Sequence, residues 1–285
     1  MKKVLVTGAS GFIGNHVINE LLKTGCYVIA TSANEEKAGS LAWFNKVKYI
    51  AFDLKTFNNN ENYFSFFDRP DVLIHLAWEG LPNYTNNFHL DENLPRHKAF
   101  LKNIIANGLK DISITGTCFE YGMQEGCLNE NMEAKPANAY ATAKNELRKW
   151  LEQMQAVQMF QLKWIRLFYM YGVGQNANSL LSQLERALVN GDAVFNMSGG
   201  EQVRDYLPIE KVAAYIVKIA LQNNVSGIIN CCSGNGITVK KFVEDYLKES
   251  NKKIDLNLGF YPYASYEPMY FWGDNTKLKT IIGNE

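Results

Sequence analysis

The first fourteen residues constrain the fold of this chain more than any other segment. The apolar run Val4-Leu5-Val6 is followed by Gly8, Gly11 and Gly14, and a stretch with helical periodicity begins at the last of them. This order predicts the first strand, turn and helix of a parallel α/β sheet. In such a turn the glycines permit a tight bend, close approach to a pyrophosphate and close packing of helix on strand, and the helix N-terminus favours phosphate. The segment therefore predicts a bound dinucleotide.

Short apolar runs continue to alternate with amphipathic stretches of helical length over the first part of the chain. The runs are rich in Val, Ile and Leu and mostly lack polar alternation, which is typical of strands buried on both faces of a parallel sheet. We expect strands at residues 3–6, 27–31, 47–52, 72–77, 111–115 and 162–168, and helices at residues 14–22, 93–107 and 140–157. The predicted fold class is α/β, a doubly wound parallel sheet of the Rossmann type.

After about residue 170 this regular pattern loosens, which suggests a smaller C-terminal lobe that binds substrate. We expect an NAD(P)-binding Rossmann domain over residues 1–169, to which later segments around 203–233 return. The substrate-binding lobe is then formed by residues 170–202 and 234–285.

Composition excludes several classes of protein. The 285 residues include 29 basic and 29 acidic side chains, so nothing indicates a nucleic-acid surface or a basic membrane patch. No stretch approaches the length of a membrane span. The five scattered cysteines form no disulfide framework, which predicts reduced thiols and a cytoplasmic location. No spacing of His, Cys and Asp supports a metal site.

The residues after the second and third predicted strands bear on the cofactor. An acidic residue about 20 positions past the glycines would bind the ribose 2′-OH of NAD, but Thr31 and Ser32 stand there, with Asn34 close behind. Hydroxyl and amide groups can accept a 2′-phosphate that a carboxylate would repel, so the sequence favours NADP(H), with NAD(H) also possible. Alternatively, the two hydroxyl residues simply begin a turn. Asp53-Leu54 either brackets the adenine or caps a helix.

A second motif supplies proton chemistry. Tyr140 and Lys144 are four residues apart on a predicted helix, so their side chains share a face. An ordinary tyrosine titrates at about 10, and a neighbouring ammonium favours the phenolate and lowers that value. The lysine can also hydrogen-bond the nicotinamide ribose. Beside a bound dinucleotide, the pair indicates redox chemistry at a carbonyl or hydroxyl carbon.

Eight segments along the chain, taken together and in order, resemble a known family. They are Thr7 to Gly14, His75-Leu76-Ala77, Glu92-Asn93, Thr117 to Gly122, Tyr140 to Lys144, Arg166 to Gly172, Arg204-Asp205-Tyr206 and Gly273 to Leu278. In this order, and over nearly the whole chain, they resemble the extended short-chain dehydrogenase/reductase family, the NAD-dependent epimerase/dehydratase group acting on nucleotide sugars. The resemblance implies a nucleotide-diphosphate sugar as substrate. It also implies a homodimer, formed by the helix after Asn93 and the helix that carries Tyr140.

The resemblance also implies residue roles. Thr117 would hydrogen-bond the reacting sugar oxygen beside Tyr140, and Arg204 would grip the nucleotide diphosphate unless it forms an ion pair with Asp205. Residues expected at the cofactor are Gly8, Ser10, Gly11, Phe12, Ile13, Gly14, Thr31, Ser32, Asn34, Asp53, Leu54, Leu76, Ala77, Trp78, Asn93, Tyr140 and Lys144. Residues expected at the substrate are Trp78, Tyr84, Thr117, Tyr169, Ser179, Leu180 and Arg204.

Departures from the family pattern narrow the reaction. Dehydratases of this family carry Asp-Glu where Cys118 and Phe119 stand, and Glu120 is shifted by one residue, so we expect it to point elsewhere. The decarboxylase pattern needs a glutamate in place of the phenylalanine. We expect the cysteine to be a packed thiol rather than the acid/base of a 3,5-epimerase. Tyr169 replaces a frequent asparagine, which suggests a reshaped substrate pocket.

The remaining reactions are reduction of a 4-keto sugar and 4-epimerisation. The sequence favours an NADPH-dependent reductase of a nucleotide-linked 4-keto-6-deoxyhexose, of the kind that feeds surface polysaccharide synthesis, with Thr117, Tyr140 and Lys144 as catalytic residues. A 4-epimerase with tightly bound NAD is the main alternative. A non-catalytic NADP-binding redox sensor is a third, which has no need of the intact tyrosine and lysine. His75 lies within a predicted buried strand and is expected to be a core residue.

Overall fold

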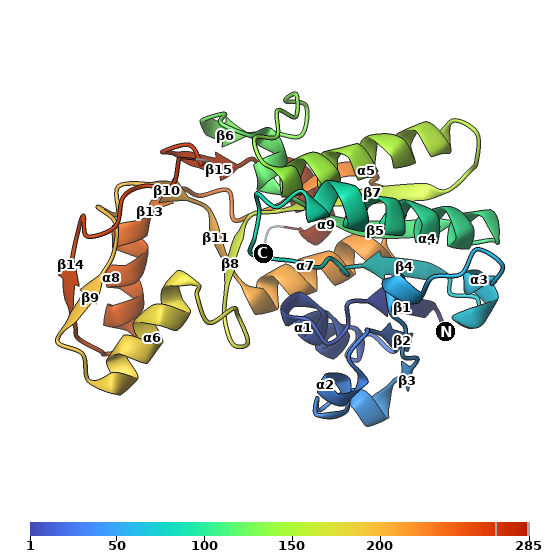
Figure 1. The fold of residues 1–285 in the computed structure, drawn as a ribbon, viewed down its shortest axis with the longest axis horizontal. Coiled ribbons are helices and arrows are strands. Elements are labelled where there is room, and N and C mark those ends of the chain that lie inside the picture. The colour runs from blue at the N-terminus through green and yellow to red at the C-terminus, as the bar shows by residue number, and fades with distance from the viewer. Residues whose placement is uncertain (266, 284–285) are drawn as a thin grey trace.

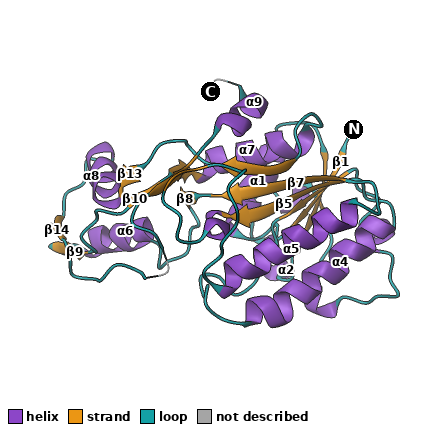
Figure 2. Cartoon of the chain, turned by 90° about the horizontal axis from the view of Figure 1, so that it is seen from above, coloured by secondary structure: helices purple, strands orange, loops and turns teal. Residues whose placement is uncertain are grey.

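A seven-stranded parallel sheet forms the centre of the molecule in the computed structural model, which describes residues 1–265 and 267–283 (Figures 1 and 2). Its strands, in spatial order, are β12 (Gly227–Cys231), β7 (Gln161–Leu167), β5 (Asp111–Thr117), β4 (Val72–His75), β1 (Lys3–Thr7), β2 (Tyr27–Thr31) and β3 (Lys48–Tyr49). Every neighbouring pair is parallel. The chain order reverses between β1 and β4, where ligands of doubly wound sheets bind. The predicted fold class is confirmed.

Helices cover both faces of this sheet. One face packs against α1 (Phe12–Leu21) and α7 (Ile209–Leu221), and the other against α4 (Leu94–Ala106) and α5 (Ala139–Gln155) (Figure 2). Successive strand residues point to opposite faces, so Val4 packs with the first pair of helices and Leu5 with the second. Burial on both faces explains why these strands read as continuous apolar runs.

Shorter elements connect these layers. They are α2 (Glu35–Gly39), η1 (Phe44–Lys46), η2 (Leu54–Thr56), α3 (Tyr63–Phe66), η3 (His89–Asn93) and η4 (Cys118–Tyr121). The predicted strand at 47–52 is assigned as strand only over Lys48–Tyr49, although Ile50 and Phe52 continue the hydrogen bonds to β2. It is an edge strand with one neighbour, which explains its short length. The helix predicted at 93–107 begins one turn earlier, because η3 leads into it.

A smaller lobe lies at one end of the sheet, at the left of Figure 1. It contains α6 (Leu180–Asn190), β9 (Val194–Asn196), β10 (Val203–Arg204), β13 (Ile237–Thr238), α8 (Val239–Glu249) and β14 (Asp255–Asn257). An apolar cluster including Leu184 and Val243 forms its core. β8 (Tyr169–Tyr171) pairs with β11 (Tyr206–Pro208) where the lobe meets the sheet.

The last segments of the chain return to the main sheet. β15 (Phe271–Gly273) pairs with β6 (Gly126–Leu128), and α9 (Thr276–Ile282) packs against α7 and β12. The predicted return of residues 203–233 to the Rossmann domain, a segment that includes α7 and β12, stays a proposal. The division of the chain into two domains at the predicted boundaries stays a proposal.

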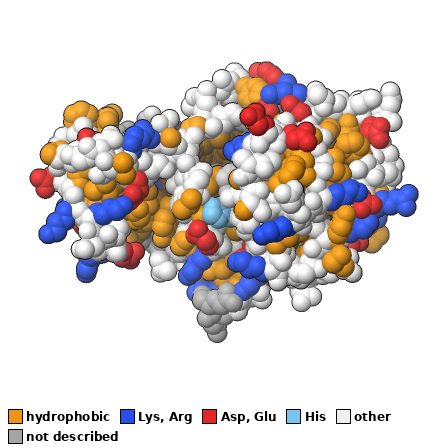
Figure 3. Space-filling model, turned by 90° about the horizontal axis from the view of Figure 1, so that it is seen from below, with side chains coloured by type: hydrophobic (Ala, Val, Ile, Leu, Met, Phe, Trp, Pro, Cys, Tyr) orange, Lys and Arg blue, Asp and Glu red, His pale blue; other side chains and the backbone are white. Residues whose placement is uncertain are grey.

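The surface has no dominant charge on the face shown in Figure 3, where basic and acidic side chains are interspersed with apolar ones. None of the helices within residues 1–265 and 267–283 is long and apolar enough to cross a membrane. In the same part of the chain, no group of three or more His, Cys, Asp and Glu side chains is arranged to hold a metal ion.

The glycine turn after β1 has almost no free space. Gly8 has a φ of +69°, and a Cβ atom there would lie 2.8 Å from the backbone nitrogen of Ala77. A Cβ on Gly14 would lie 2.2 Å from the carbonyl oxygen of Gly8. Helix α1 therefore rests directly on the turn, and only glycine permits this approach.

We expect Gly14→Ala to destabilise the protein by about 1–3 kcal/mol or more, the cost typical of overpacking, because backbone atoms must move to admit the Cβ. Gly39→Ala is the matched control, since a Cβ there meets no atom within 4 Å. The control should be neutral or slightly stabilising. Urea unfolding of both variants measures the difference, and equal midpoints would contradict the role assigned to this contact.

Candidate active site

A cavity of about 170 Å³ lies at the carboxyl ends of β1, β2 and β4, at the point where the strand order reverses. Its walls come from the glycine turn, the ends of β2 and β3, and the start of α4. The expected cofactor residues among them are Gly8, Thr31, Ser32, Leu54, Ala77, Trp78 and Asn93. The tertiary structure thus brings together residues that lie up to 85 positions apart (93 − 8) in the sequence.

The residues present fit a dinucleotide. Thr31 lines the cavity, and its buried hydroxyl has no hydrogen-bond partner among residues 1–265 and 267–283. An unpartnered buried hydroxyl is costly, and a ribose hydroxyl could satisfy it. Phe12 and Ile13 begin α1, where free N–H groups favour a pyrophosphate.

Three expected cofactor residues have local partners. The Asn34 side chain caps α2 by accepting the N–H of Lys37. Ser32 Oγ lies 3.1 Å from the hydroxyl of Tyr49. Asp53 accepts the backbone N–H of Lys55 and so caps η2, which is the alternative we gave for it. These contacts weaken the case for a 2′-phosphate site built from the second strand.

Sequence reasoning missed a group of charges at the same cavity. Lys55 and Arg96 both line it, and both lie near the carboxylate of Glu79, at 3.0 Å and 4.0 Å respectively. Asn93 fixes the loop that carries this glutamate, because its amide donates to the Glu79 carbonyl oxygen at 3.0 Å. No motif links these residues, which come from three separate segments.

The three expected catalytic residues converge. Tyr140 and Lys144 project from the first turns of α5, whose N-terminus is capped by Asn138. Thr117 ends β5, and its side chain hydrogen-bonds that of the tyrosine. The Lys144 ammonium donates to the carbonyl oxygen of Thr115 at 2.8 Å. This geometry can deliver a proton to an oxygen that contacts both hydroxyl groups.

The expected lowering of the tyrosine pKa is not found. Burial raises the pKa of the Tyr140 phenol, and the nearby Tyr84 and Glu120 raise it further, while the hydrogen bond with Thr117 acts in the opposite direction. Lys144 is not among the groups that lower the pKa of Tyr140. Burial disfavours the charge of this lysine. The tyrosine therefore keeps its proton at neutral pH, which suits a proton donor.

Lys144 is itself strongly perturbed. Burial lowers its pKa to about 7, and the negative charge of Glu120 acts against this shift. The Nζ atom lies 4.1 Å from the centroid of the Trp78 ring, so the indole face partly replaces water around it. The ammonium is thus poised to exchange a proton near neutral pH.

Aromatic rings enclose Tyr140. Its ring centroid lies 6.0 Å from that of Trp78 and 5.7 Å from that of Tyr84, so both expected wall residues reach the site. The backbone N–H of Tyr140 also donates to the Tyr84 carbonyl oxygen. His89, which sequence reasoning missed, accepts the indole N–H of Trp78 and fixes that ring.

His75 is a core residue, as expected. Its Nδ1 lies 2.8 Å from the Thr7 hydroxyl and its Nε2 lies 2.7 Å from Nδ1 of His97. Burial lowers its pKa to about 3, so the imidazole stays neutral. The histidine therefore helps to hold the end of β1 in place and carries no charge into the site.

Cys118 and Phe119, which stand where the dehydratases of the family carry Asp-Glu, have no carboxylate. Cys118 is buried in an apolar cluster, and burial raises the pKa of its thiol. Phe119 packs edge-on against Tyr84 and Tyr169. Glu120 points into the core and accepts hydrogen bonds there, so its predicted different direction agrees with the structure.

Arg204 is paired, but not with the residue we considered. Its Nε and Nη2 donate to the Glu267 carboxylate at 3.2 Å and 2.9 Å, and Tyr169 donates to the same oxygen at 2.7 Å. Asp205 instead accepts the backbone N–H groups of Ser233, Gly234 and Gly273. The alternative of an Arg204–Asp205 ion pair is wrong. A diphosphate that binds this arginine must displace or share Glu267.

The comparison with family models decides the classification. The model of the NAD-dependent epimerase/dehydratase family matches residues 4–232. The chain belongs to this family. Since the match begins in β1 and ends directly after β12, it includes the glycine turn and the converging Thr117, Tyr140 and Lys144.

Relatives of this epimerase/dehydratase-family member span nearly its whole length. It is 31% identical to a dTDP-6-deoxy-L-talose 4-dehydrogenase (NAD(+)) of Aggregatibacter actinomycetemcomitans over 95% of this chain and 98% of that one. It is 26% identical to a GDP-6-deoxy-D-talose 4-dehydrogenase of the same organism, covering 99% and 92%. UDP-glucuronic acid 4-epimerase from Bacillus cereus has the same fold, with a TM-score of 0.85, 22% identity, and coverage of 99% and 93%.

Two expected substrate residues of this family member lie in the lobe. Ser179 stands at the N-terminus of α6, and its hydroxyl donates to that of Ser182 at 2.8 Å. Leu180 is the first residue of the helix and packs with the apolar core of the lobe. Their role at the diphosphate stays a prediction.

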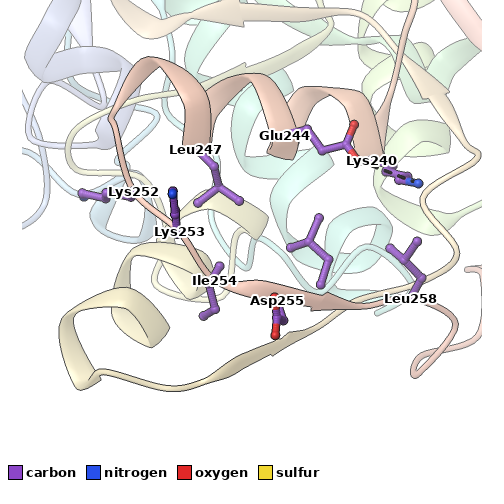
Figure 4. A pocket seen from close by; sticks show the side chains of 9 residues that line it. Lys240, Glu244, Leu247, Lys252, Lys253, Ile254, Asp255 and Leu258 are labelled. Carbon is purple, nitrogen blue, oxygen red and sulfur yellow. Dashed lines mark ion pairs between the residues drawn. The ribbon is translucent and has the colours of Figure 1, made fainter.

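A second hollow lies on the lobe between α8 and β14 (Figure 4). Leu247 and Ile254 contribute apolar surface, while Lys240, Lys252 and Glu244 are charged groups around it. Lys252 is already paired with Glu185 at 2.7 Å. None of the expected catalytic or cofactor residues lines this hollow, whereas Trp78 both lines the cavity at the sheet and contacts Tyr140 and Lys144.

We expect Lys144→Met to raise the stability of the family member at neutral pH. The pKa of about 7 in the folded protein lies below the ordinary lysine value of 10.5. The unfolded chain therefore binds more protons between these two pH values, and the free energy of unfolding rises with pH across that window. The protonation penalty at pH 7 is on the order of 4 kcal/mol, and the lost hydrogen bond to Thr115 offsets about 1 kcal/mol of the gain.

Thermal unfolding at pH 6.5 and pH 9.5 measures this effect. The variant should melt a few degrees above the unmodified protein at pH 6.5, and the difference should shrink at pH 9.5. A difference that is independent of pH would contradict the lowered pKa of Lys144.

Proposed function

We propose that this protein reduces the C4 ketone of a nucleotide-linked 4-keto-6-deoxyhexose with a nicotinamide cofactor, and that Thr117, Tyr140 and Lys144 carry the reaction. The observation that carries the proposal is that Tyr140 is protonated while the neighbouring positions that hold acid/base groups in other reactions of the family are taken by Phe119 and a protonated Cys118. Phe119 stands where elimination or decarboxylation needs a carboxylate, and the Cys118 thiol is buried and protonated. Hydride transfer at one carbon needs a single acid.

The names of two relatives support C4 of the sugar as the reacting carbon. Both are named as 4-dehydrogenases of 6-deoxytalose linked to dTDP or GDP. Oxidation of a C4 hydroxyl and reduction of a C4 ketone are two directions of one reaction, so an enzyme that catalyses one also catalyses the other. Because burial raises the pKa of Tyr140, the phenol carries its proton at neutral pH, and that proton is available for reduction of the ketone.

The chain supplies binding, orientation and the proton. A bound nicotinamide cofactor supplies the hydride. Thr117 hydrogen-bonds the substrate oxygen and fixes its distance from Tyr140, and the phenol protonates the oxygen as the C4–H bond forms. Lys144 keeps positive charge beside the phenolate that remains. Trp78, Tyr84 and Phe119 exclude water from this centre.

The choice of cofactor stays open to measurement within this proposal. The missing carboxylate after β2 favours NADP(H), but Asn34 and Ser32 are engaged locally and a relative is named for NAD(+). We therefore propose that the enzyme uses NAD(H) and tolerates NADP(H). The homodimer through α4 and α5 and the cytoplasmic location stay predictions.

Ala33→Asp tests tolerance of the 2′-phosphate. Ala33 is exposed and lines the cavity directly after β2, so a carboxylate there repels a phosphate without disturbing the core. We expect kcat/KM with NADPH, relative to NADH, to fall about tenfold or more, equivalent to about 1.4 kcal/mol. Ala33→Asn is the uncharged control and should leave the ratio unchanged. A ratio unaffected by the aspartate would place the ribose elsewhere.

The reaction itself is tested by absorbance at 340 nm with NADH or NADPH and dTDP-4-keto-6-deoxyglucose. We expect stoichiometric oxidation of the cofactor and a loss of about a hundredfold or more in kcat for Tyr140→Phe, because positioned acid catalysis is removed. Cofactor affinity should remain nearly unchanged. Full activity of the phenylalanine variant would refute the assigned acid.

A 4-epimerase is the second candidate, since UDP-glucose 4-epimerases are also among the relatives. The one from Lactobacillus helveticus is 23% identical over 99% of this chain and 92% of its own. An epimerase must retain its cofactor between two hydride transfers, whereas a reductase exchanges it at each turnover. Protein that carries NAD through gel filtration and fails to oxidise NADH with the keto sugar would favour the epimerase.

A further inference from the structure

Glu120 is a buried carboxylate that the reaction described above does not use. Its side chain has no solvent exposure. Oε1 accepts the backbone N–H of Thr117 at 2.9 Å and the indole N–H of Trp164 at 2.9 Å. Oε2 accepts the Nε–H of Arg166 at 2.9 Å. A buried charge is costly unless it is paired and hydrogen-bonded, and this one is both.

The same carboxylate reaches the helix that carries the catalytic pair. Arg148 of α5 has its Nε 3.9 Å from Glu120 Oε2, and this nitrogen has no hydrogen-bond partner within the described residues. The rest of that guanidinium is held by Asn145 and Glu152. One carboxylate thus connects the end of β5, β7 and α5.

The space around the carboxylate is closely filled. A Cβ on Gly116 would lie 2.4 Å from Glu120 Oε1 and 2.2 Å from the indole nitrogen of Trp164. Glycine at position 116 permits this close approach of the Glu120 carboxylate to β5, where Oε1 accepts the backbone N–H of Thr117. The carboxylate and the catalytic hydroxyl are coupled in position.

The negative charge of Glu120 also acts on the pKa values of the reacting groups. It raises the pKa of Lys144 and that of Tyr140. The other titratable groups that face Lys144 are His75, His89 and His97, and burial lowers the pKa of each, so they stay neutral. Among the described groups, Glu120 is the only one whose charge favours the protonated form of Lys144.

We propose that Glu120 is a positioning residue for C4 reduction, whose buried carboxylate holds Thr117 against α5 and stabilises the ammonium form of Lys144 on that helix. The electrostatic part concerns the folded protein itself, while its consequence for turnover rests on the proposed function. Arg166 and Arg148 offset part of the negative charge of the carboxylate.

The test compares Glu120→Gln and Glu120→Asp with a matched control. Asp111→Asn removes the carboxylate of another buried ion pair, which joins β5 to β7 through Lys163 at 2.8 Å. That pair lies at the opposite ends of the same two strands from the reacting groups. It should lower stability without changing the titration or the turnover of the folded protein.

The direct readout is the titration of Lys144 in cofactor-free protein, followed through the ¹³Cε resonance of labelled lysine and assigned with Lys144→Met. We expect a midpoint near 7 in the unmodified protein. It should fall by about one pH unit or more in Glu120→Gln, and stay close to the original value in Glu120→Asp and Asp111→Asn. An unchanged midpoint in folded Glu120→Gln overturns the proposal.

The second readout is the pH profile of kcat. In Glu120→Gln the alkaline limb should move to lower pH by the same amount, with kcat reduced and KM for the sugar nucleotide nearly unchanged. Glu120→Asp should restore the profile with a lower maximum. A loss of activity without a shift of the profile would mean a purely structural role and would also overturn the proposal.

Failure to fold does not prevent the test. The double variant Glu120→Gln/Arg166→Met removes both partners of the ion pair, a change that buried pairs often tolerate. It should show a smaller fall in the Lys144 midpoint than Glu120→Gln, because loss of the Arg166 charge partly compensates for loss of the carboxylate, and an unchanged or raised midpoint contradicts the proposal. If the unmodified protein does not reduce the keto sugar, the proposed function fails, while the NMR titration still decides the role of Glu120.

Discussion

The burial of charge at the carboxyl ends of β5 and β7 is the constraint on which the site depends. Glu120 and Arg166 are both removed from water, and Lys144 lies buried nearby with its ammonium on a backbone carbonyl oxygen. Each of these groups would be strongly destabilising alone. Their mutual contacts fix the end of β5 against α5. The catalytic geometry is therefore a consequence of satisfying buried charges.

The substrate side of the site is organised by a different pairing. Arg204 already has a carboxylate partner in Glu267, and Tyr169 binds the same oxygen. An arginine that holds a diphosphate in competition with a carboxylate binds it more weakly than an unpaired one, because the anion must replace an existing contact. The pairing brings the strand that carries Arg204 next to the segment that precedes β15, before any ligand arrives.

Several features could be predicted because they are local in the sequence. The glycine turn, the strands of the central sheet and the four-residue spacing of Tyr140 and Lys144 all follow from periodicity and backbone geometry. Thr117-x-x-Glu120 is also a capping-box pattern, and that signal was present in the sequence although its buried ion pairs were not apparent. By contrast, Glu267 lies 63 residues from Arg204, and no local pattern joins them.

The sequence by itself determined the parallel α/β fold, the glycine turn and the choice of Thr117, Tyr140 and Lys144 as the three proposed catalytic side chains. The reason is that strand burial, glycine spacing and helical periodicity are properties of short segments. Only the tertiary structure decided the protonation of these side chains and the partner of Arg204. Desolvation and ion pairing depend on which distant residues exclude water around a group, and the fold alone sets that environment.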